Sequence, residues 1–203
     1  MAYFPFFVDL EGRHGLIVGG GRVALRKAEK LLPFGPGLTV VAPEILPELA
    51  ALPAVRPVRR AFAPGDITPD LAFVIAASDD RARNHQIALL CRERGIPVNA
   101  VDTPEDCSFL FPALAQSGPL SVGVSTGGAS PTAAVWVKER VQALLPERFG
   151  DILTWLAERR EPLRRRFPEE AARADILKRL FAACLERGRP LTEAELTEIL
   201  EGY

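Results

Sequence analysis

The sequence has few of the residues that build metal sites or disulfide frameworks. Its 203 residues include three cysteines, Cys91, Cys107 and Cys184, and two histidines, His14 and His85. The cysteines lie far apart without a Cys-x-x-Cys pair, so neither a disulfide framework nor a thiolate zinc site is expected. Two histidines are too few for a histidine-rich metal cage. We therefore predict no bound metal and a reducing, cytoplasmic location.

Long apolar runs and an excess of either charge are also missing from the sequence. No run approaches the roughly 18 apolar residues of a membrane span, and residues 1–7 lack the basic segment and apolar core of a signal peptide. Lys and Arg number 25 against 26 Asp and Glu, which gives a formal net charge of −1. Because this balance creates no general attraction to polyanions, neither nucleic acid nor membrane is expected as a partner.

A glycine cluster directly after a short apolar run is the most informative feature present. Residues 15–24 read Gly-Leu-Ile-Val-Gly-Gly-Gly-Arg-Val-Ala, a pattern typical of a strand, a tight turn and a helix start. They fit the dinucleotide-binding fingerprint in its Ala-ending form. One glycine permits the sharp turn, and another lets a pyrophosphate approach main-chain N–H groups. The predicted nucleotide contacts are Gly19, Gly20, Gly21, Arg22 and Val23.

Short apolar runs alternate with helical patterns through residues 1–112, which predicts an α/β, Rossmann-like parallel sheet. The runs are apolar throughout, as expected for strands that are covered on both faces. The expected strands are 15–18, 38–42, 71–77 and 97–101, with a weaker one at 55–58, and the expected helices are 23–32 and 81–94.

The pattern changes after Pro112. A strand over 120–125 leads through a glycine turn to a helix over 130–145, with Ser130 as the N-cap and Pro131 at the first helical position. The remaining expected elements are all helices, at 149–160, 169–187 and 193–200. The sequence therefore predicts a nucleotide-binding domain at 1–112, a strand–helix region at 113–146 and a small all-helical C-terminal domain at 147–203.

The end of the second strand departs from the common dinucleotide site. An acid about 20 residues beyond the glycines usually holds the ribose. Here the strand ends in Ala42-Pro43, and Glu44 falls slightly late. We therefore expect a non-standard ribose contact through Pro43 and Glu44. Arg22 is either a solvated side chain or a partner for a 2′-phosphate, so the residues leave the choice between NAD and NADP open.

Two further strand ends carry candidate site residues, because ligands of open α/β sheets bind beyond the carboxyl ends of strands. Ala77 and Ser78 are small and leave room for a cofactor, while Asp79 and Asp80 are expected to cap the next helix. Asp102 follows the strand at 97–101 and has no evident capping role. It is a candidate general base, although a structural role fits the pattern equally well.

The last candidate segment lies before the helix at 130–145. Ser125, Thr126, Gly127 and Gly128 offer hydroxyl and amide groups that suit an anionic substrate, and the alternative is a simple glycine hinge. His85 is expected on a helix surface rather than as a ligand. The arginines between 159 and 166 are expected to form a solvated face, with a polycarboxylate ligand as the alternative.

Taken in order, these motifs resemble those of the precorrin-2 dehydrogenase and sirohydrochlorin ferrochelatase family, which also forms the N-terminal module of multifunctional sirohaem synthases. Each motif alone is weak, but the ordered set is specific, and the helical tail matches in kind only. The matching segments are residues 3–7, 18–27, 40–44, 75–84, 98–102, 109–112, 125–131 and 145–146.

The resemblance implies that the chain uses NAD⁺ to oxidise precorrin-2 to sirohydrochlorin, and that it inserts Fe²⁺ if it is one of the bifunctional members. It also implies a homodimer built through 113–146, nucleotide contacts at 19–23 and 43–44, and a functional aspartate at Asp102. Asn99 and the loop 125–128 become candidate substrate contacts, and Lys27 and Arg81 become candidate partners for substrate carboxylates. The length leaves no room for a methyltransferase domain, so methylation is expected elsewhere.

Two other functions remain open at this point. A non-catalytic NAD-sensing module explains the glycine turn but neither Asp102 nor the loop at 125–131. Another small NAD(P)-dependent dehydrogenase is the second alternative. The residues do not separate a dehydrogenase from a bifunctional chelatase, because Asp102 could accept protons in either reaction.

Overall fold

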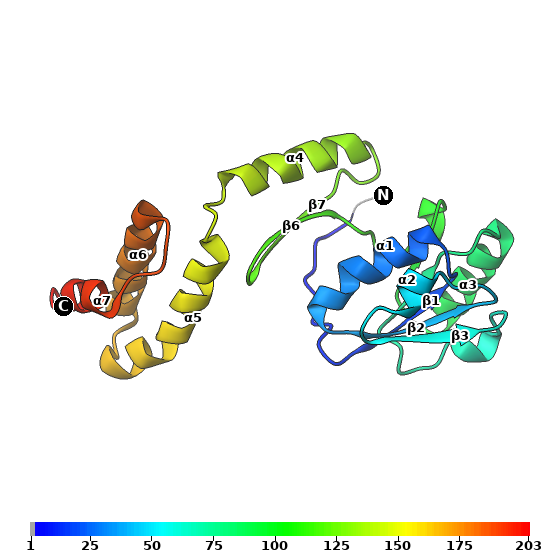
Figure 1. Cartoon of the computed structure of the whole chain (residues 1–203), viewed down its shortest axis with the longest axis horizontal. Helices are drawn as coiled ribbons and strands as arrows, with labels where there is room; N and C mark the ends of the chain where they lie inside the picture. Colours follow the sequence, from blue (N-terminus) through cyan, green and yellow to red (C-terminus); the bar gives the residue numbers. More distant parts are fainter. Residues whose placement is uncertain (1–2) are drawn as a thin grey trace. The chain divides into compact units, whose positions relative to one another are not determined.

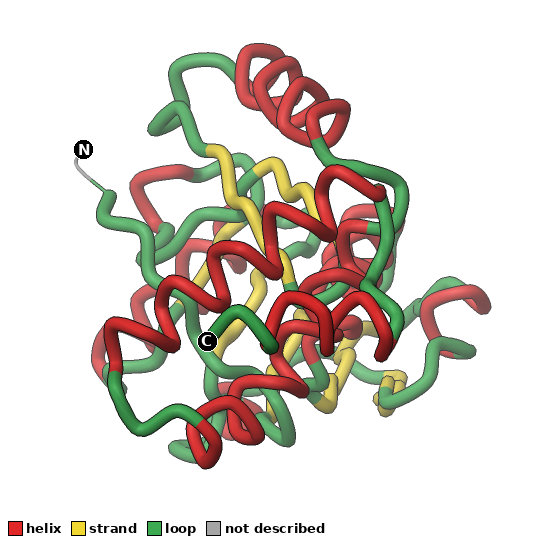
Figure 2. The backbone as a smooth tube through the Cα atoms, turned by 90° about the vertical axis from the view of Figure 1, so that its left-hand side faces the viewer, coloured by secondary structure: helices red, strands yellow, loops and turns green. Residues whose placement is uncertain are grey.

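The computed structural model describes residues 3–203, and the chain divides into two compact units, residues 1–111 and residues 112–203. Figure 1 colours the backbone along the sequence, and Figure 2 colours it by element type. Each unit has a hydrophobic core of its own. The division of the second unit into a dimerisation region and a helical domain stays a prediction.

Unit 1 is an α/β fold around a five-stranded parallel sheet, which confirms the predicted fold class. Its strands are β1 His14–Val18, β2 Gly37–Ala42, β3 Val55–Arg59, β4 Phe73–Ala76 and β5 Val98–Ala100. Its α-helices are α1 Arg22–Leu31, α2 Pro47–Ala50 and α3 Arg81–Glu93, and short 3₁₀ turns span Leu32–Phe34, Pro64–Asp66 and Pro104–Asp106.

The strand order β3-β2-β1-β4-β5 places the topological switch point between β1 and β4. Val18 pairs with both Val41 and Ala76, and Ala76 pairs with Ala100. The carboxyl ends of β1, β2, β4 and β5 are therefore level with one another, so the loops that follow them share one edge of the sheet.

Helices α1 and α3 cover opposite faces of this sheet (Figure 1). Successive strand residues point to opposite faces, so each strand contributes to both layers. The α1 layer contains Ala24, Ala28, Ile17, Val40 and Ile75, and the α3 layer contains Ile87, Ala88, Leu16, Val74 and Val98. This two-sided burial explains why the strand sequences are almost wholly apolar.

The predicted N-terminal cap of α3 is confirmed. The Asp80 side chain accepts a hydrogen bond from the Arg83 N–H at 3.0 Å, as an N-cap does. Gly95, just beyond the helix, has a φ of +67° and so provides the left-handed residue that ends it. The strands predicted over 71–77 and 97–101 are shorter in the structure, where β4 and β5 span 73–76 and 98–100.

Unit 2 begins with an antiparallel hairpin and continues as four helices. The hairpin is β6 Ala113–Ser117 with β7 Leu120–Val124, and the helices are α4 Pro131–Leu144, α5 Phe149–Arg166, α6 Glu170–Arg187 and α7 Glu193–Leu200. Helix α4 packs against both strands, and α6 packs against α5 and α7. The Ser130 N-cap forms as predicted, and Thr192 and Glu195 form a capping box at the start of α7.

Two elements of unit 2 differ from the sequence prediction. Strand β6 was not predicted, because Ala-Leu-Ala-Gln-Ser lacks β-branched residues and pairing with β7 decides its conformation. Helix α5 was expected to end at Arg160 but continues through Pro162 to Arg166. Leu163, one residue beyond the proline, is buried in the unit 2 core, and this packing supports the helix where proline weakens it. Among residues 3–203, no helix is both long and apolar enough to span a bilayer.

Candidate functional site

The glycine turn joins β1 to α1 at the switch point of the sheet. Gly19 has a φ of +124°, a conformation that side chains rarely adopt, and its N–H donates to the Val41 carbonyl at 3.0 Å. A Cβ on Gly19 would lie 2.1 Å from the Ala77 carbonyl oxygen. The first glycine is therefore required by close packing between the ends of β1 and β4.

Gly20 lets the loop after β2 pack directly on the turn. Its carbonyl accepts a hydrogen bond from the Leu46 N–H at 2.9 Å, and a Cβ at this position would lie 2.0 Å from the Glu44 carbonyl oxygen. The predicted ribose contacts Pro43 and Glu44 are thus held beside the glycines, with both side chains exposed.

Gly21 differs from the other two glycines because nothing occupies the space that its Cβ would fill. It is the N-cap of α1 in an extended conformation, no side chain caps the helix, and a Cβ would meet no atom within 4 Å. The first-turn N–H groups of a helix lack internal partners and favour anions. An open face with these donors fits a dinucleotide pyrophosphate. Arg22 and Val23 begin the helix, with Arg22 exposed.

The loop after β4 is held by one buried amide. The Asn84 Oδ1 accepts hydrogen bonds from the Ser78 hydroxyl at 2.7 Å and the Ser78 N–H at 3.1 Å, and the Asn84 Nδ2 donates to the Ser78 carbonyl at 2.9 Å. Ala77 is buried and donates its N–H to the Val18 carbonyl at 2.7 Å. Both predicted cofactor contacts of this loop therefore border the glycine turn, on a fixed backbone.

Asp102 lies on the same edge of the sheet, two residues beyond β5. It is exposed and has a φ of +60°, which is uncommon for a residue with a side chain. The Arg81 Nη2 donates to its backbone carbonyl at 3.3 Å. Conformations of this kind cost energy and cluster at functional sites. Asp102 is therefore placed where the sequence predicted, and its catalytic role stays a prediction.

Asn99, predicted as a substrate contact, has its amide engaged within the protein. It is 6% exposed, its Oδ1 accepts a hydrogen bond from Lys27 Nζ at 3.2 Å, and its Nδ2 donates to the Phe109 carbonyl at 3.0 Å. Lys27 Nζ also lies 3.6 Å from the centre of the Phe111 ring. Burial lowers the pKa of Lys27 to about 8. The Asn99 amide is therefore already engaged by Lys27 and Phe109, and its contact with substrate stays a prediction.

The loop of unit 2 at 125–128 uses its hydroxyl groups locally. The Thr126 Oγ1 accepts a hydrogen bond from the Ser130 N–H and donates one to the Ser130 carbonyl, both at 3.0 Å. The Ser125 Oγ accepts one from the Gly127 N–H at 3.2 Å, and Gly127 and Gly128 have φ values of +63° and +91°. The glycines therefore shape a defined turn, and its contact with substrate stays a prediction.

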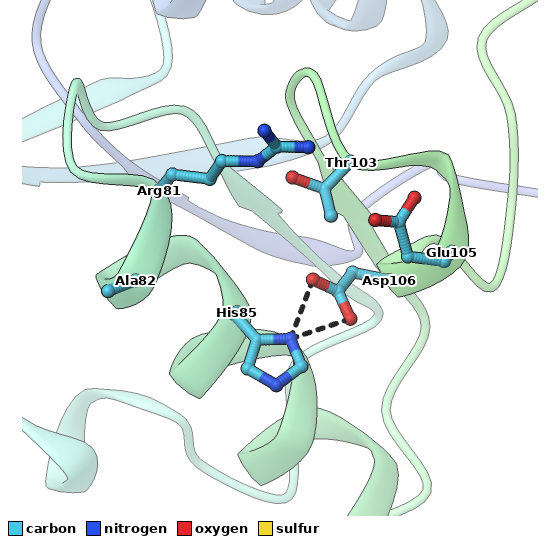
Figure 3. Close-up of a pocket in the computed structure, with 6 residues that line it drawn as sticks. All are labelled: Arg81, Ala82, His85, Thr103, Glu105 and Asp106. Atoms are coloured by element: carbon cyan, nitrogen blue, oxygen red, sulfur yellow. Dashed lines mark hydrogen bonds and ion pairs between the residues drawn. The ribbon is translucent and has the colours of Figure 1, made fainter.

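Sequence reasoning missed a histidine–carboxylate pair that joins α3 to the 3₁₀ turn Pro104–Asp106 (Figure 3). His85, on α3, places its Nδ1 2.8 and 2.9 Å from the two carboxylate oxygens of Asp106, which is 1% exposed. Arg92 Nη2 lies 3.7 Å from the same carboxylate. The pair lines a shallow hollow of about 410 Å³ together with Arg81 and Thr103. No local sequence motif predicts the His85–Asp106 pair, because 21 residues separate the two partners.

Asp106→Ala is expected to lower the free energy of unfolding by about 1–3 kcal/mol, because hydrogen bonds to a buried carboxylate are lost and its cavity is left empty. Chemical denaturation of the two proteins measures the difference. His85→Ala is the matched control, and a smaller loss is expected because the imidazole is half exposed. Equal stability of Asp106→Ala and wild type would contradict a stabilising role for the pair.

Two segments of the chain match known protein families. Residues 6–113 match the model of an NAD(P)-binding family, and residues 117–144 match the family described as sirohaem biosynthesis protein central. The NAD(P)-binding match contains the glycine turn, Asp102 and the Lys27 cluster, so the predicted NAD cofactor agrees with it.

Curated relatives and a solved structure are similar over most of the chain. The siroheme synthase of Methylococcus capsulatus is 41% identical over 88% of this chain and 38% of its own length. The siroheme synthase of Pseudomonas aeruginosa is 37% identical over 100% of this chain and 44% of its own length. The chain thus spans less than half of these relatives. The structure of SirC, a precorrin-2 dehydrogenase, matches with a TM-score of 0.71 and 26% identity over 98% of both chains.

Proposed function

This chain belongs to an NAD(P)-binding family, its residues 117–144 match the central region of sirohaem biosynthesis proteins, and we propose that it oxidises precorrin-2 to sirohydrochlorin with NAD⁺. The observation that carries the proposal is the shared sheet edge. The open face of Gly21 and the exposed carboxylate of Asp102 both follow strand ends that are level with one another. A dinucleotide site and an acid–base group on one edge are what hydride removal with proton loss requires.

The chain's own residues have distinct tasks in this reaction. The first turn of α1 holds the pyrophosphate through main-chain N–H groups, and the loop at Pro43–Glu44 borders the ribose. NAD⁺, when bound, supplies the hydride acceptor. Oxidation removes one hydride and one proton from the macrocycle, and the Asp102 carboxylate accepts the proton. Ala77 and Ser78 leave room beside the glycines because their side chains are small.

Ferrochelation extends the proposal to a second reaction, in which Fe²⁺ is a substrate. The curated relatives are siroheme synthases, and sirohaem forms when Fe²⁺ enters sirohydrochlorin. Metal entry displaces two pyrrole protons, and the exposed carboxylate of Asp102 is a candidate acceptor for them. This reaction is a separate proposal from the dehydrogenation, and it is tested separately.

The proposal includes a homodimer in the cytoplasm. Helix α4 leaves Val135, Trp136 and Leu144 exposed, a set of apolar side chains that a second copy of the chain would cover. All three cysteines are free thiols, which fits a reducing compartment. Analytical ultracentrifugation of the wild type and of Trp136→Glu tests the dimer, and a monomeric wild type would contradict it.

The dehydrogenase is tested by incubating the protein with NAD⁺ and precorrin-2 generated in situ. We expect sirohydrochlorin and NADH to appear in equal amounts, above the rate without protein and the rate without NAD⁺. NAD⁺ binding without sirohydrochlorin formation would instead support the NAD-sensing module. Fe²⁺ or Co²⁺ added to sirohydrochlorin, with and without protein, shows whether the chain accelerates metal insertion.

A further inference from the structure

Lys27 is a half-buried cation of unit 1, and among residues 3–203 it has no carboxylate ion-pair partner. Its Nζ donates to the Asn99 Oδ1 at 3.2 Å and lies 3.6 Å from the centre of the Phe111 ring. Both partners are uncharged. Charges that are withdrawn from solvent are ordinarily paired, and the open countercharge position at this half-buried ammonium is one that an anionic ligand group can fill.

The surroundings of Lys27 strengthen the positive potential at this point. Burial is the main cause that lowers the pKa of Lys27 to about 8, and the neighbouring charges of Lys30 and Arg26 act in the same direction. The Cys107 thiol is the ionisable group that acts on it from the segment after β5, and burial raises the pKa of that thiol. The thiol therefore stays neutral and does not compensate the lysine.

The residues that contact the ammonium are themselves held by other parts of unit 1. Asn99 is itself held by the Phe109 carbonyl at 3.0 Å, and the rings of Phe109 and Phe111 pack together with their centres 5.7 Å apart. An ammonium has three N–H donors. One is used by Asn99, and the ammonium also faces the Phe111 ring, so at least one donor remains for a ligand. Asn99 lies on β5, three residues before Asp102, which places this donor on the strand that leads to the proposed acid–base group.

We propose that Lys27 anchors a carboxylate of the tetrapyrrole substrate, with Asn99 and Phe111 as positioning residues that hold its ammonium. The inference rests on the proposed function, because precorrin-2 carries several carboxylate side chains around its ring. An ion pair formed with a ligand in a partly desolvated place is stronger than one formed at an exposed surface. Lys27 thereby contributes to substrate affinity and not to the chemical step.

The anchor makes substrate binding depend on pH in a defined direction. Only the charged lysine attracts a carboxylate, and the fraction charged in the free protein falls as the pH rises through about 8. The KM for precorrin-2 should therefore increase above this pH. The bound carboxylate favours the charged form, so binding above pH 8 is accompanied by uptake of a proton.

Two variants separate the charge from the packing. Lys27→Gln removes the charge and retains a hydrogen-bond donor for Asn99, while Lys27→Arg stays charged at every pH used. We expect Lys27→Gln to raise the KM for precorrin-2 by roughly 10- to 100-fold, with kcat and the Kd for NAD⁺ close to wild type. Lys27→Arg should bind precorrin-2 almost as tightly as the wild type does, and its KM should not increase above pH 8.

Titration with sirohydrochlorin, the product, supplies a readout that does not need turnover. Calorimetry in two buffers of different ionisation enthalpy should detect proton uptake above pH 8 for the wild type and none for Lys27→Arg. A wild type that binds sirohydrochlorin without oxidising precorrin-2 would overturn the proposed function alone, and Lys27→Gln would still test the anchor. Unchanged KM, unchanged sirohydrochlorin affinity and an unchanged pH profile in Lys27→Gln would overturn the anchor.

Discussion

Asp102→Asn is expected to lower kcat for precorrin-2 oxidation by about 100-fold or more, with the Kd for NAD⁺ within about twofold of wild type. Proton transfer by a positioned side chain contributes roughly 10²- to 10⁴-fold to a rate, and an amide cannot accept the proton. The glycine turn that holds the nucleotide belongs to a different strand end and is untouched by the change. Steady-state kinetics and an NAD⁺ titration measure the two quantities.

The backbone at Asp102 makes asparagine the informative replacement. The φ of +60° is a conformation that asparagine tolerates about as well as aspartate, whereas alanine pays roughly 1–2 kcal/mol for it. Asp102→Asn therefore removes the carboxylate and keeps the turn. Asp102→Gly is the matched control, because glycine adopts the same φ freely and also lacks the carboxylate.

The two variants together distinguish a chemical role from a structural one. If the carboxylate accepts the proton, Asp102→Asn and Asp102→Gly should lose activity to a similar extent while keeping the melting temperature of the wild type. Full activity in either variant would remove Asp102 from the mechanism. If Fe²⁺ insertion is also catalysed, its response to the same two variants shows whether one carboxylate serves both reactions.

The parts of the fold that the sequence predicted well are those fixed by local chemistry. The glycines, the Asp80 and Ser130 caps and the apolar strands each carry a signal within a few residues. Strand β6 could not be predicted in the same way, because its small residues become a strand only through pairing with β7. The continuation of α5 beyond Pro162 likewise depends on the tertiary packing of Leu163.

The candidate site shows the same division. The positions of the glycine turn and Asp102 follow from the rule that ligands bind at the carboxyl ends of parallel strands. The Lys27–Asn99 hydrogen bond joins residues 72 apart, and the His85–Asp106 pair joins residues 21 apart. Both separations reach beyond a single helix or strand, so no local pattern reveals these contacts. The family resemblance named Lys27, with Arg81, as a candidate partner for substrate carboxylates, and the pattern placed His85 on a helix surface.

The second large effect is expected in the glycine turn. Alanine at Gly20 should lower the stability of the protein, whereas alanine at the adjacent Gly21 should weaken NAD⁺ binding. Gly20→Ala places a Cβ 2.0 Å from the Glu44 carbonyl oxygen, a clash with backbone that only a movement of the loop can relieve. We expect it to lower the free energy of unfolding by about 3 kcal/mol or more, at the upper end of overpacking effects. Thermal or denaturant unfolding measures this loss.

Gly21→Ala is expected to fold as the wild type does and to lose nucleotide binding. Its backbone, with φ −89° and ψ −169°, suits any residue, and its Cβ would meet no protein atom within 4 Å. The added methyl group instead enters the space from which a pyrophosphate would approach the first turn of α1. The Kd for NAD⁺ should rise by roughly 10- to 100-fold, because a clash between this methyl group and the pyrophosphate costs about as much as an overpacked contact in a protein core.

The comparison of the two alanine variants tests where the nucleotide lies. Stability should fall in Gly20→Ala and hold in Gly21→Ala, while NAD⁺ affinity should fall in Gly21→Ala even where the protein is fully folded. Wild-type NAD⁺ affinity in a folded Gly21→Ala protein would mean that the pyrophosphate does not approach this face. The opposite result supports a pyrophosphate against the open face of Gly21, on the sheet edge that it shares with Asp102.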